Sequence, residues 1–206
     1  MAQKGYFITF EGTDGAGKST HLKTAQAMLE ARGYKTLALR EPGGTSLGEA
    51  IRHLVLNPAY TDTMPETELL LMCAARAQLV REVIEPALQE GMAVLCDRFA
   101  DSTIAYQGYG RGLDLTGIEQ VLQVATGGLQ PDRTILLDVN PDLIVHRRKA
   151  VRDRIEEEDL SFQKKVRQGF RSIAARDTKR VRLLDANRDV DAVRQDIEHI
   201  IKEDIE

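Results

Sequence analysis

Hydrophobic positions along the chain follow two alternating periods. Short runs rich in β-branched and apolar residues predict five strands, at 6–10, 35–40, 92–96, 134–139 and 181–184. Stretches with apolar residues three and four positions apart predict helices, at 21–32, 47–56, 66–89, 115–125, 160–175 and 190–201. Strands that alternate with helices indicate an α/β fold, a parallel five-stranded sheet flanked by helices on both faces with right-handed crossovers.

Two stretches do not fit this simple alternation. Pro86 lies inside the longest helical pattern, so we expect it to kink or break that helix. The polar segment 101–112 is predicted to be loop-like at its glycine-rich end.

Length and charge exclude several classes of protein. With 206 residues the chain suffices for one substantial core, so we expect a single domain over 1–206. A net charge of −4 does not suggest a nucleic-acid or membrane partner. The first predicted strand begins at residue 6, and no apolar run approaches the ~20 residues of a membrane span. Cys73 and Cys96 lack metal-site spacing and are expected to be reduced, buried thiols, as in a soluble cytoplasmic protein.

The strongest motif is a glycine-rich loop between the first predicted strand and the first helix. It fits the phosphate-binding pattern Gly, four residues, Gly, Lys, Ser/Thr, and reads Gly12-Thr13-Asp14-Gly15-Ala16-Gly17-Lys18-Ser19, followed by Thr20. Its glycines let backbone N–H groups turn around a polyphosphate, and the helix N-terminus adds a favourable field. Lys18 is expected to reach the phosphates of ATP, and the Ser19 hydroxyl to bind Mg²⁺.

Polar groups also follow the second and third predicted strands. Glu41-Pro42-Gly43-Gly44-Thr45 follows one of them, and Asp97-Arg98-Phe99 ends the other. Asp97 is a candidate second ligand of Mg²⁺; the alternative is an aspartate that caps the next segment. Arg98 offers a fork of donors suited to a phosphate. Because ligands of parallel sheets bind at the carboxyl ends of strands, we expect one site built from three strand ends.

Arginines elsewhere leave alternatives open. Arg76 lies on the apolar stripe of the long helix, so it is either half of a buried ion pair, a side chain that reaches water, or a donor to a ligand. The charged segment 147–159 is either a solvated helix face, with Arg152–Glu156 and Arg154–Glu158 pairs, or an arginine-rich lid over the transferring phosphate. Its position before the last strand favours the lid.

Taken together, these segments resemble bacterial thymidylate kinase over nearly the whole chain. The matching stretches are 10–20, 40–45, 74–78, 97–99, 102–108, 111–112 and 153–156. The resemblance implies a P-loop NTP hydrolase fold and Mg²⁺-dependent transfer of the γ-phosphoryl group of ATP to dTMP, giving dTDP for dTTP biosynthesis, in a homodimer. The lid would then supply a catalytic arginine beside Lys18 and Arg98, with Arg147, Arg148 and Arg152 as candidates.

The resemblance also implies the residues that hold dTMP. Arg76 would donate to a thymine carbonyl, with Thr103 near the other edge of the base, and Tyr106 would crowd the 2′ position. Arg98 would hold the acceptor phosphate, and Asp14 and Glu11 would lie near the 3′-hydroxyl and the metal. Further candidate contacts are Pro42, Met72, Ser102 and Gln107. Met72 departs from the family, which usually has a phenylalanine there to stack on thymine.

Two other functions are consistent with the motifs. One is a P-loop kinase for another pyrimidine nucleotide or a nucleoside; a nucleoside acceptor needs a base for its hydroxyl proton, and Glu41 is a candidate. The other is a nucleotide-binding regulator without turnover, which suits a chain lacking Asp97 or the lid arginines better than this one.

Overall fold

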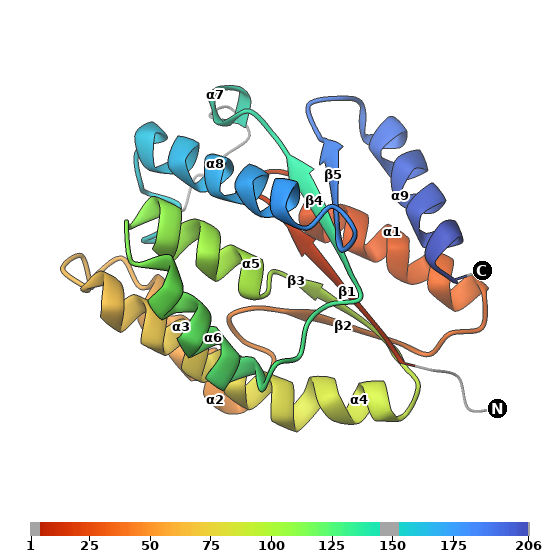
Figure 1. Ribbon diagram of the computed structural model, residues 1–206, viewed down its shortest axis with the longest axis horizontal. Helices are drawn as coiled ribbons and strands as arrows, with labels where there is room; N and C mark the ends of the chain where they lie inside the picture. Colours follow the sequence, from red (N-terminus) through yellow and green to blue (C-terminus); the bar gives the residue numbers. More distant parts are fainter. Residues whose placement is uncertain (1–4, 145–152, 206) are drawn as a thin grey trace.

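The computed structural model describes residues 5–144 and 153–205 (Figure 1). Its elements alternate as the hydrophobic pattern predicts, and they are, in order, β1 (Tyr6–Glu11), α1 (Lys18–Ala31), β2 (Thr36–Arg40), α2 (Ser46–Leu56), α3 (Pro65–Leu79), the π-helical turn η1 (Val80–Ile84), α4 (Glu85–Gln89), β3 (Ala93–Asp97), α5 (Ala100–Thr103), the π-helical segment η2 (Ile104–Gly110), α6 (Leu115–Thr126), β4 (Arg133–Asp138), α7 (Pro141–Ile144), α8 (Leu160–Arg176), β5 (Val181–Asp185) and α9 (Val190–Ile205).

All five strands form one parallel sheet in the order β2-β3-β1-β4-β5. The register places Phe10 of β1 beside Asp97 of β3, and Arg40 of β2 on the other side of Asp97. The ends of β1, β2 and β3 are therefore neighbours at one edge. This confirms the predicted sheet and brings the three polar strand ends together.

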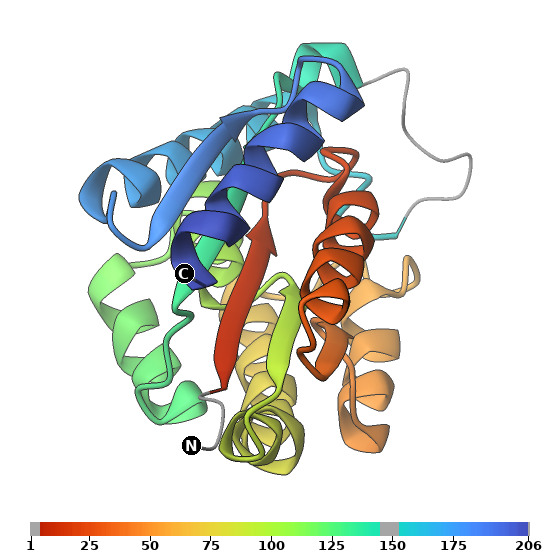
Figure 2. The same cartoon turned by 90° about the vertical axis from the view of Figure 1, so that its right-hand side faces the viewer.

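Side chains of the central strands are buried on both faces, which is why these strands are nearly continuously apolar. Ile8 and Phe10 belong to a core with α1 and α9, whereas Phe7 packs in the opposite core with η1. Both views of the ribbon show α1 and α9 running beside each other (Figures 1 and 2). In Figure 2 the loop after β1 and the segment that begins at residue 153 lie at the same end of the molecule, beyond the tip of β1.

The predicted interruption at Pro86 takes the form of η1, which ends at Ile84, two residues before the proline. Proline has no N–H to donate to the preceding turn, and a single π-helical turn widens the backbone there without ending the helix. Residues 65–89 therefore run on as one helical stretch with a local bulge.

The prediction of a loop-like end at 101–112 is wrong, because α5 and η2 keep this segment helical as far as Gly110. Gly108 and Gly110 serve close packing instead of turning, whereas Gly112, with a φ of 82°, lies beyond the end of η2. A Cβ atom on Gly110 would lie 2.7 Å from the Phe162 ring on α8, and one on Gly169 of α8 would lie 2.8 Å from Tyr109. Glycines on both partners let η2 and α8 approach closely.

Cys73 and Cys96 are both buried and free, as expected. Within residues 5–144 and 153–205, no helix combines the length and the apolar character that crossing a bilayer demands.

Candidate active site

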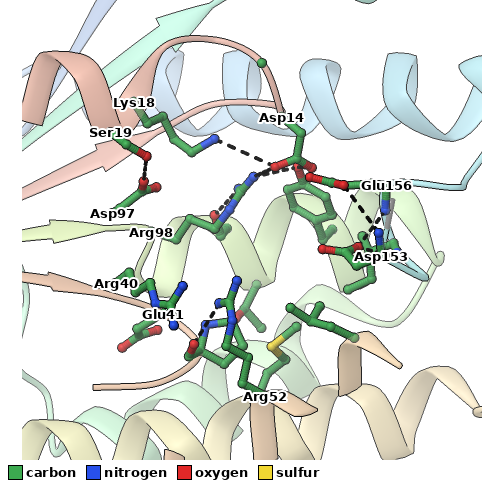
Figure 3. Close-up of a pocket in the computed structure, with 18 of the residues that line it drawn as sticks. Asp14, Lys18, Ser19, Arg40, Glu41, Arg52, Asp97, Arg98, Asp153 and Glu156 are labelled. Carbon is green, nitrogen blue, oxygen red and sulfur yellow. Dashed lines mark hydrogen bonds and ion pairs between the residues drawn. The ribbon is translucent and has the colours of Figure 1, made fainter. Parts of the chain in front are cut away.

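A cavity of about 440 Å³ opens where β1, β2 and β3 end (Figure 3). Most of the predicted site residues line it, namely Asp14, Gly15, Gly17, Lys18, Ser19, Thr20, Pro42, Met72, Arg76, Asp97, Arg98, Ser102, Thr103, Tyr106 and Gln107. Gly12, Thr13 and Ala16 are buried within the same loop. The three polar strand ends thus meet in one cavity, as expected.

The glycine-rich loop depends on backbone conformations and spaces that suit glycine. Gly12 has a φ of 136°, and a Cβ atom there would lie 2.4 Å from the Leu137 carbonyl oxygen. Gly17, with a φ of 90°, is the N-cap residue of α1. This path folds the loop back over Lys18, whose Nζ donates to the carbonyls of Gly12 and Thr13 at 3.1 and 3.0 Å. Burial, together with the nearby charge of Arg98, lowers the pKa of Lys18 to about 8.

Arg98 is held in place by the loop and by η2. Its backbone has a φ of 76°, a left-handed conformation unusual for a residue with a side chain, and its N–H donates to the Phe10 carbonyl at 3.0 Å. Its guanidinium donates to Asp14 at 2.5 Å and to Tyr106 Oη at 3.1 Å. Burial raises the pKa of Asp14, but Arg98 and Lys18 outweigh it and lower that pKa to about 2, so Asp14 stays ionised.

A hydrogen bond between Ser19 and Asp97 connects the glycine-rich loop to the third strand. The Ser19 hydroxyl donates to Asp97 Oδ2 at 2.6 Å, joining the start of α1 to the end of β3 (Figure 3). A hydroxyl and a carboxylate at this spacing make a pair of hard oxygen ligands.

Of the three alternatives for Arg76, the structure shows the buried ion pair. Its guanidinium forms a buried ion pair with Glu41, with Nη2 2.6 Å from Oε2, and donates to Thr103 Oγ1 at 2.8 Å. Both charged side chains also line the cavity. Burial raises the pKa of Glu41 even beside this arginine, and its Oε1 has no hydrogen-bond partner among the described residues.

Glu11 is the exception among the expected acceptor residues, because it lies behind the cavity wall. It is fully buried, and its two oxygens accept from the Phe99 N–H at 2.7 Å and from Ser102 Oγ at 2.6 Å. Burial and the charge of Asp101 raise the pKa of Glu11 to about 8. A direct contact of Glu11 with a sugar or a metal therefore does not follow from this geometry.

The structure adds residues that sequence reasoning missed, and they are Arg40, Arg52, Leu56, Asp153, Ile155 and Glu156. Arg52 is anchored by donation to the Pro42 carbonyl at 2.9 Å. Burial and the charge of Arg40 lower the pKa of Arg52, and Arg98 contributes in the same direction. Mutual repulsion of arginines at one wall is typical of a site for an anion. The spacing of residues in the sequence did not indicate that Arg52 belongs to the site, because Arg52 reaches the cavity only through the packing of α2.

The alternative of a solvated helix face with an Arg154–Glu158 pair does not match the structure. Arg154 is buried and instead pairs with Glu68 of α3, with 2.6 Å between Nη2 and Oε2, while Glu158 pairs with Arg111. Residues 154–157 form turns and residue 158 a bend, so the helical spacing on which that pairing rested does not exist. Of the expected lid over 147–159, the candidates Arg147, Arg148 and Arg152 lie outside the described residues, as does the Arg152–Glu156 pair.

Comparison with known proteins decides the family. A family model described as thymidylate kinase matches residues 10–197. The chain belongs to the thymidylate kinase family. A thymidylate kinase of Deinococcus radiodurans is 49% identical over 196 residues, covering 94% of this chain and 95% of that protein. One from Pelotomaculum thermopropionicum is 48% identical, covering 94% and 91%.

A solved thymidylate kinase structure agrees with these relatives. The enzyme from Ehrlichia chaffeensis superposes with a TM-score of 0.78 at 33% identity, covering 96% of this chain and 99% of that one. The expected fold and the expected thymidylate kinase function are thus confirmed. This protein is a nucleoside monophosphate kinase, a phosphotransferase.

Proposed function

We propose that the γ-phosphoryl group of ATP passes to dTMP, giving dTDP, inside the cavity at the ends of β1, β2 and β3. One observation carries this assignment: a phosphate-binding loop and a separate cluster of arginines open on the same cavity. Such an arrangement suits two phosphorylated molecules that meet head to head.

The loop from Gly12 to Thr20 is the proposed donor end. Lys18 is already held over the loop by two carbonyls, so its ammonium lies where a polyphosphate cradled by the loop would pass. A bound phosphate favours the charged form of a lysine whose pKa is about 8, which keeps Lys18 cationic during transfer.

Ser19 and Asp97 are the proposed holders of Mg²⁺. Their hydroxyl and carboxylate oxygens match the hard ligands that Mg²⁺ prefers, and Mg²⁺ usually takes only one or two protein ligands beside phosphates. When bound, Mg²⁺ supplies positive charge to the phosphates.

The arginine cluster is the proposed acceptor end for the dTMP phosphate. Arg98 is oriented by Asp14, Ser102 and the Gly12 carbonyl, and Arg52 by the Pro42 carbonyl. A phosphomonoester has a second pKa near ~6, so its attacking oxygen is largely deprotonated at neutral pH. The protein therefore needs no general base; it has to align two polyanions and offset their charge.

The far part of the cavity is proposed to hold the base and sugar of dTMP. Arg76, Thr103 and Gln107 offer polar groups for the thymine edges, and Met72 offers a thioether for its face. Tyr106 is fixed against Arg98 and Asp14, which lets it limit the space beside the sugar. Arg147, Arg148 and Arg152 stay our candidates for the arginine that meets the transferring phosphate.

Two variants test the division into donor and acceptor ends. Lys18→Met is expected to abolish turnover with the fold retained, because the donor phosphates lose their central cation. Arg52→Gln is expected to raise the KM for dTMP roughly 10- to 100-fold with little change in the KM for ATP, since one charge-assisted bond is lost. Equal changes in both KM values for Arg52→Gln contradict the proposed acceptor end.

We also propose a homodimer formed through α2, α3 and α6. These neighbouring helices expose Leu47, Leu54, Leu70 and Val124, of which Val124 is 82% exposed. Exposed apolar side chains on adjacent helices are typical of an interface. Sedimentation of the Leu54→Glu/Val124→Glu variant is expected to give a monomer where the parent gives a dimer; a dimeric variant contradicts this face.

A cytoplasmic location completes the proposal. Two free, buried thiols and an ATP-dependent reaction support it.

A further inference from the structure

Glu68 of α3 is a buried carboxylate behind the acceptor end of the cavity. Its side chain is 1% exposed, and it accepts hydrogen bonds from three residues of other segments. Gln107 Nε2 lies 2.8 Å from Oε1, Arg111 Nη2 lies 3.1 Å from Oε2, and Arg154 Nη2 lies 2.6 Å from Oε2. Burial raises the pKa of Glu68, but the bonds from Arg111 and Gln107 outweigh it and hold the pKa below its ordinary value. Glu68 is thus an ionised, acceptor-only group.

The contact with Gln107 fixes the orientation of an amide that lines the cavity. An ionised carboxylate cannot donate, so the nitrogen of the amide, and not its oxygen, has to face Glu68. A glutamine amide without such a partner flips at little cost. The donor and acceptor atoms that Gln107 presents to a substrate are therefore set by Glu68.

The contact with Arg154 fixes a second part of the cavity. Arg154 also donates from Nε to the Val55 carbonyl at 3.0 Å, and its backbone N–H donates to the Leu56 carbonyl at 3.2 Å. Its neighbours Asp153, Ile155 and Glu156 line the cavity, whereas Arg154 lies against Glu68. Glu68 thus ties this wall to α3.

Arg111 strengthens the same connection. It bonds both oxygens of Glu68, pairs with Glu158 beyond the wall, and lies 4.7 Å from the centre of the Phe162 ring. Arg111 and Arg154 thus share one carboxylate, that of Glu68. Removing its charge leaves Arg154 buried without a charged partner among these residues.

We propose that Glu68 is a positioning residue for the acceptor nucleotide: it fixes the amide of Gln107 and the wall formed by Asp153, Ile155 and Glu156, and thereby sets both affinity for dTMP and preference for its base. The inference rests on the proposed assignment of this end of the cavity to dTMP. Thymine and cytosine have opposite hydrogen-bonding groups at two ring positions: the O4 acceptor of thymine is replaced by an amino donor in cytosine, and the N3–H donor by an acceptor nitrogen. An amide of fixed orientation therefore discriminates between them, and a freely flipping amide does not.

Glu68→Gln tests the proposal, with Glu66→Gln as the matched control at an exposed position of the same helix. Glutamine keeps the shape but can donate, which frees the Gln107 amide to turn over. We expect the KM for dTMP to rise about tenfold, the KM for ATP to stay within about twofold, and the preference for dTMP over dCMP in kcat/KM to fall about tenfold. Glu66→Gln is expected to match the parent in all three.

A purely structural role for Glu68 predicts a different result. It lowers the melting temperature and the active fraction, hence kcat, while both KM values and the base preference stay at the parent's values; that result overturns the proposal. Glu68→Asp carries the same test if Glu68→Gln does not fold. Aspartate keeps an acceptor-only carboxylate, but its side chain is shorter. The KM for dTMP is therefore expected to rise while the base preference is retained.

A double-mutant cycle separates the two connections. In a Gln107→Met background, adding Glu68→Gln is expected to leave the dTMP:dCMP preference unchanged, because there is no amide left to orient; a further loss of preference overturns the role assigned to Gln107. The activity of the parent enzyme distinguishes a failure of the proposed function from a failure of this inference. A parent that phosphorylates no dTMP contradicts the proposed function itself, whereas an active parent with an unaltered Glu68→Gln variant contradicts only this inference.

Discussion

Replacing Arg76 by methionine removes the positive half of a buried ion pair and leaves the negative half in place. Arg76 and Glu41 are 3% and 4% exposed, and the two groups are 2.6 Å apart. Breaking a buried pair by deleting one partner costs about 3–5 kcal/mol, because the remaining charge is desolvated without compensation. Thr103 Oγ1 and the Phe99 carbonyl lose a donor in the same step. We therefore expect Arg76→Met to lower the free energy of unfolding by about 3–5 kcal/mol at pH 8.

The loss is expected to depend on pH in a definite direction. Burial already raises the pKa of Glu41 above its ordinary value of 4.5, although Arg76 lowers it, so the pKa rises further in the variant. The folded variant then keeps a proton that the unfolded chain releases above pH 4.5, and its stability falls as pH rises from there. The destabilisation is thus smaller at pH 5 than at pH 8. Adding Glu41→Gln is expected to recover much of it at pH 8.

Urea unfolding at both pH values measures these changes. Arg81→Met is the control, since the exposed Arg81 pairs with the half-buried Glu85 within one helical stretch, and i,i+4 pairs at a helix surface contribute only about 0.3–0.5 kcal/mol. An Arg76→Met loss as small as that of Arg81→Met, or one that is the same at pH 5 and pH 8, refutes the reasoning.

Three further changes have defined outcomes. Glu11→Gln removes a carboxyl group whose pKa is raised to about 8. The stability of the parent relative to this variant should therefore fall as pH rises from 4.5 to about 8, by up to about 1.4 kcal/mol per pH unit in urea unfolding. Parallel pH profiles of the two proteins contradict this. Met72→Phe is expected to lower the KM for dTMP about two- to tenfold through ring stacking, with the KM for ATP unchanged, and a higher KM for dTMP rules out stacking there. Gly110→Ala places a Cβ atom 2.7 Å from the Phe162 ring and should lower the melting temperature by an amount equivalent to about 1–3 kcal/mol. Gly117→Ala, whose Cβ has space, should change stability by no more than about 0.5 kcal/mol, and equal losses in both variants contradict the close-packing argument.

Features that depend on neighbouring residues in the chain were predictable from the sequence. The loop after β1 requires glycines at fixed positions before Lys18, so its motif can be recognised in the sequence without knowledge of the rest of the fold. The alternation of strands and helices likewise gave the parallel sheet, and parallel strands necessarily bring Glu41, Asp97 and the loop to one edge. Even so, η2 was mispredicted, because Gly110 serves contact with α8 and not a turn.

Features that depend on packing between distant segments were not predictable. Arg154 and Glu68 are 86 positions apart, and their pairing arises only once α3 and the residues after 152 lie on the same side of the cavity. Helical spacing instead suggested Glu158, which binds Arg111. Arg52 reaches the cavity because α2 packs against α3, and Glu11 lies behind Ser102 because α5 begins directly after Phe99.

The most direct measurement is acceptor-dependent ADP release from ATP and Mg²⁺, with dTMP, dUMP, UMP, dCMP, dGMP and thymidine compared in separate reactions. We expect dTMP to be preferred strongly over every other acceptor, and thymidine to give no release, because the arginines of the acceptor end require a phosphate. Turnover of thymidine, or ADP release that no nucleoside monophosphate stimulates in a folded, ATP-binding protein, contradicts the central claim that the cavity joins ATP to dTMP.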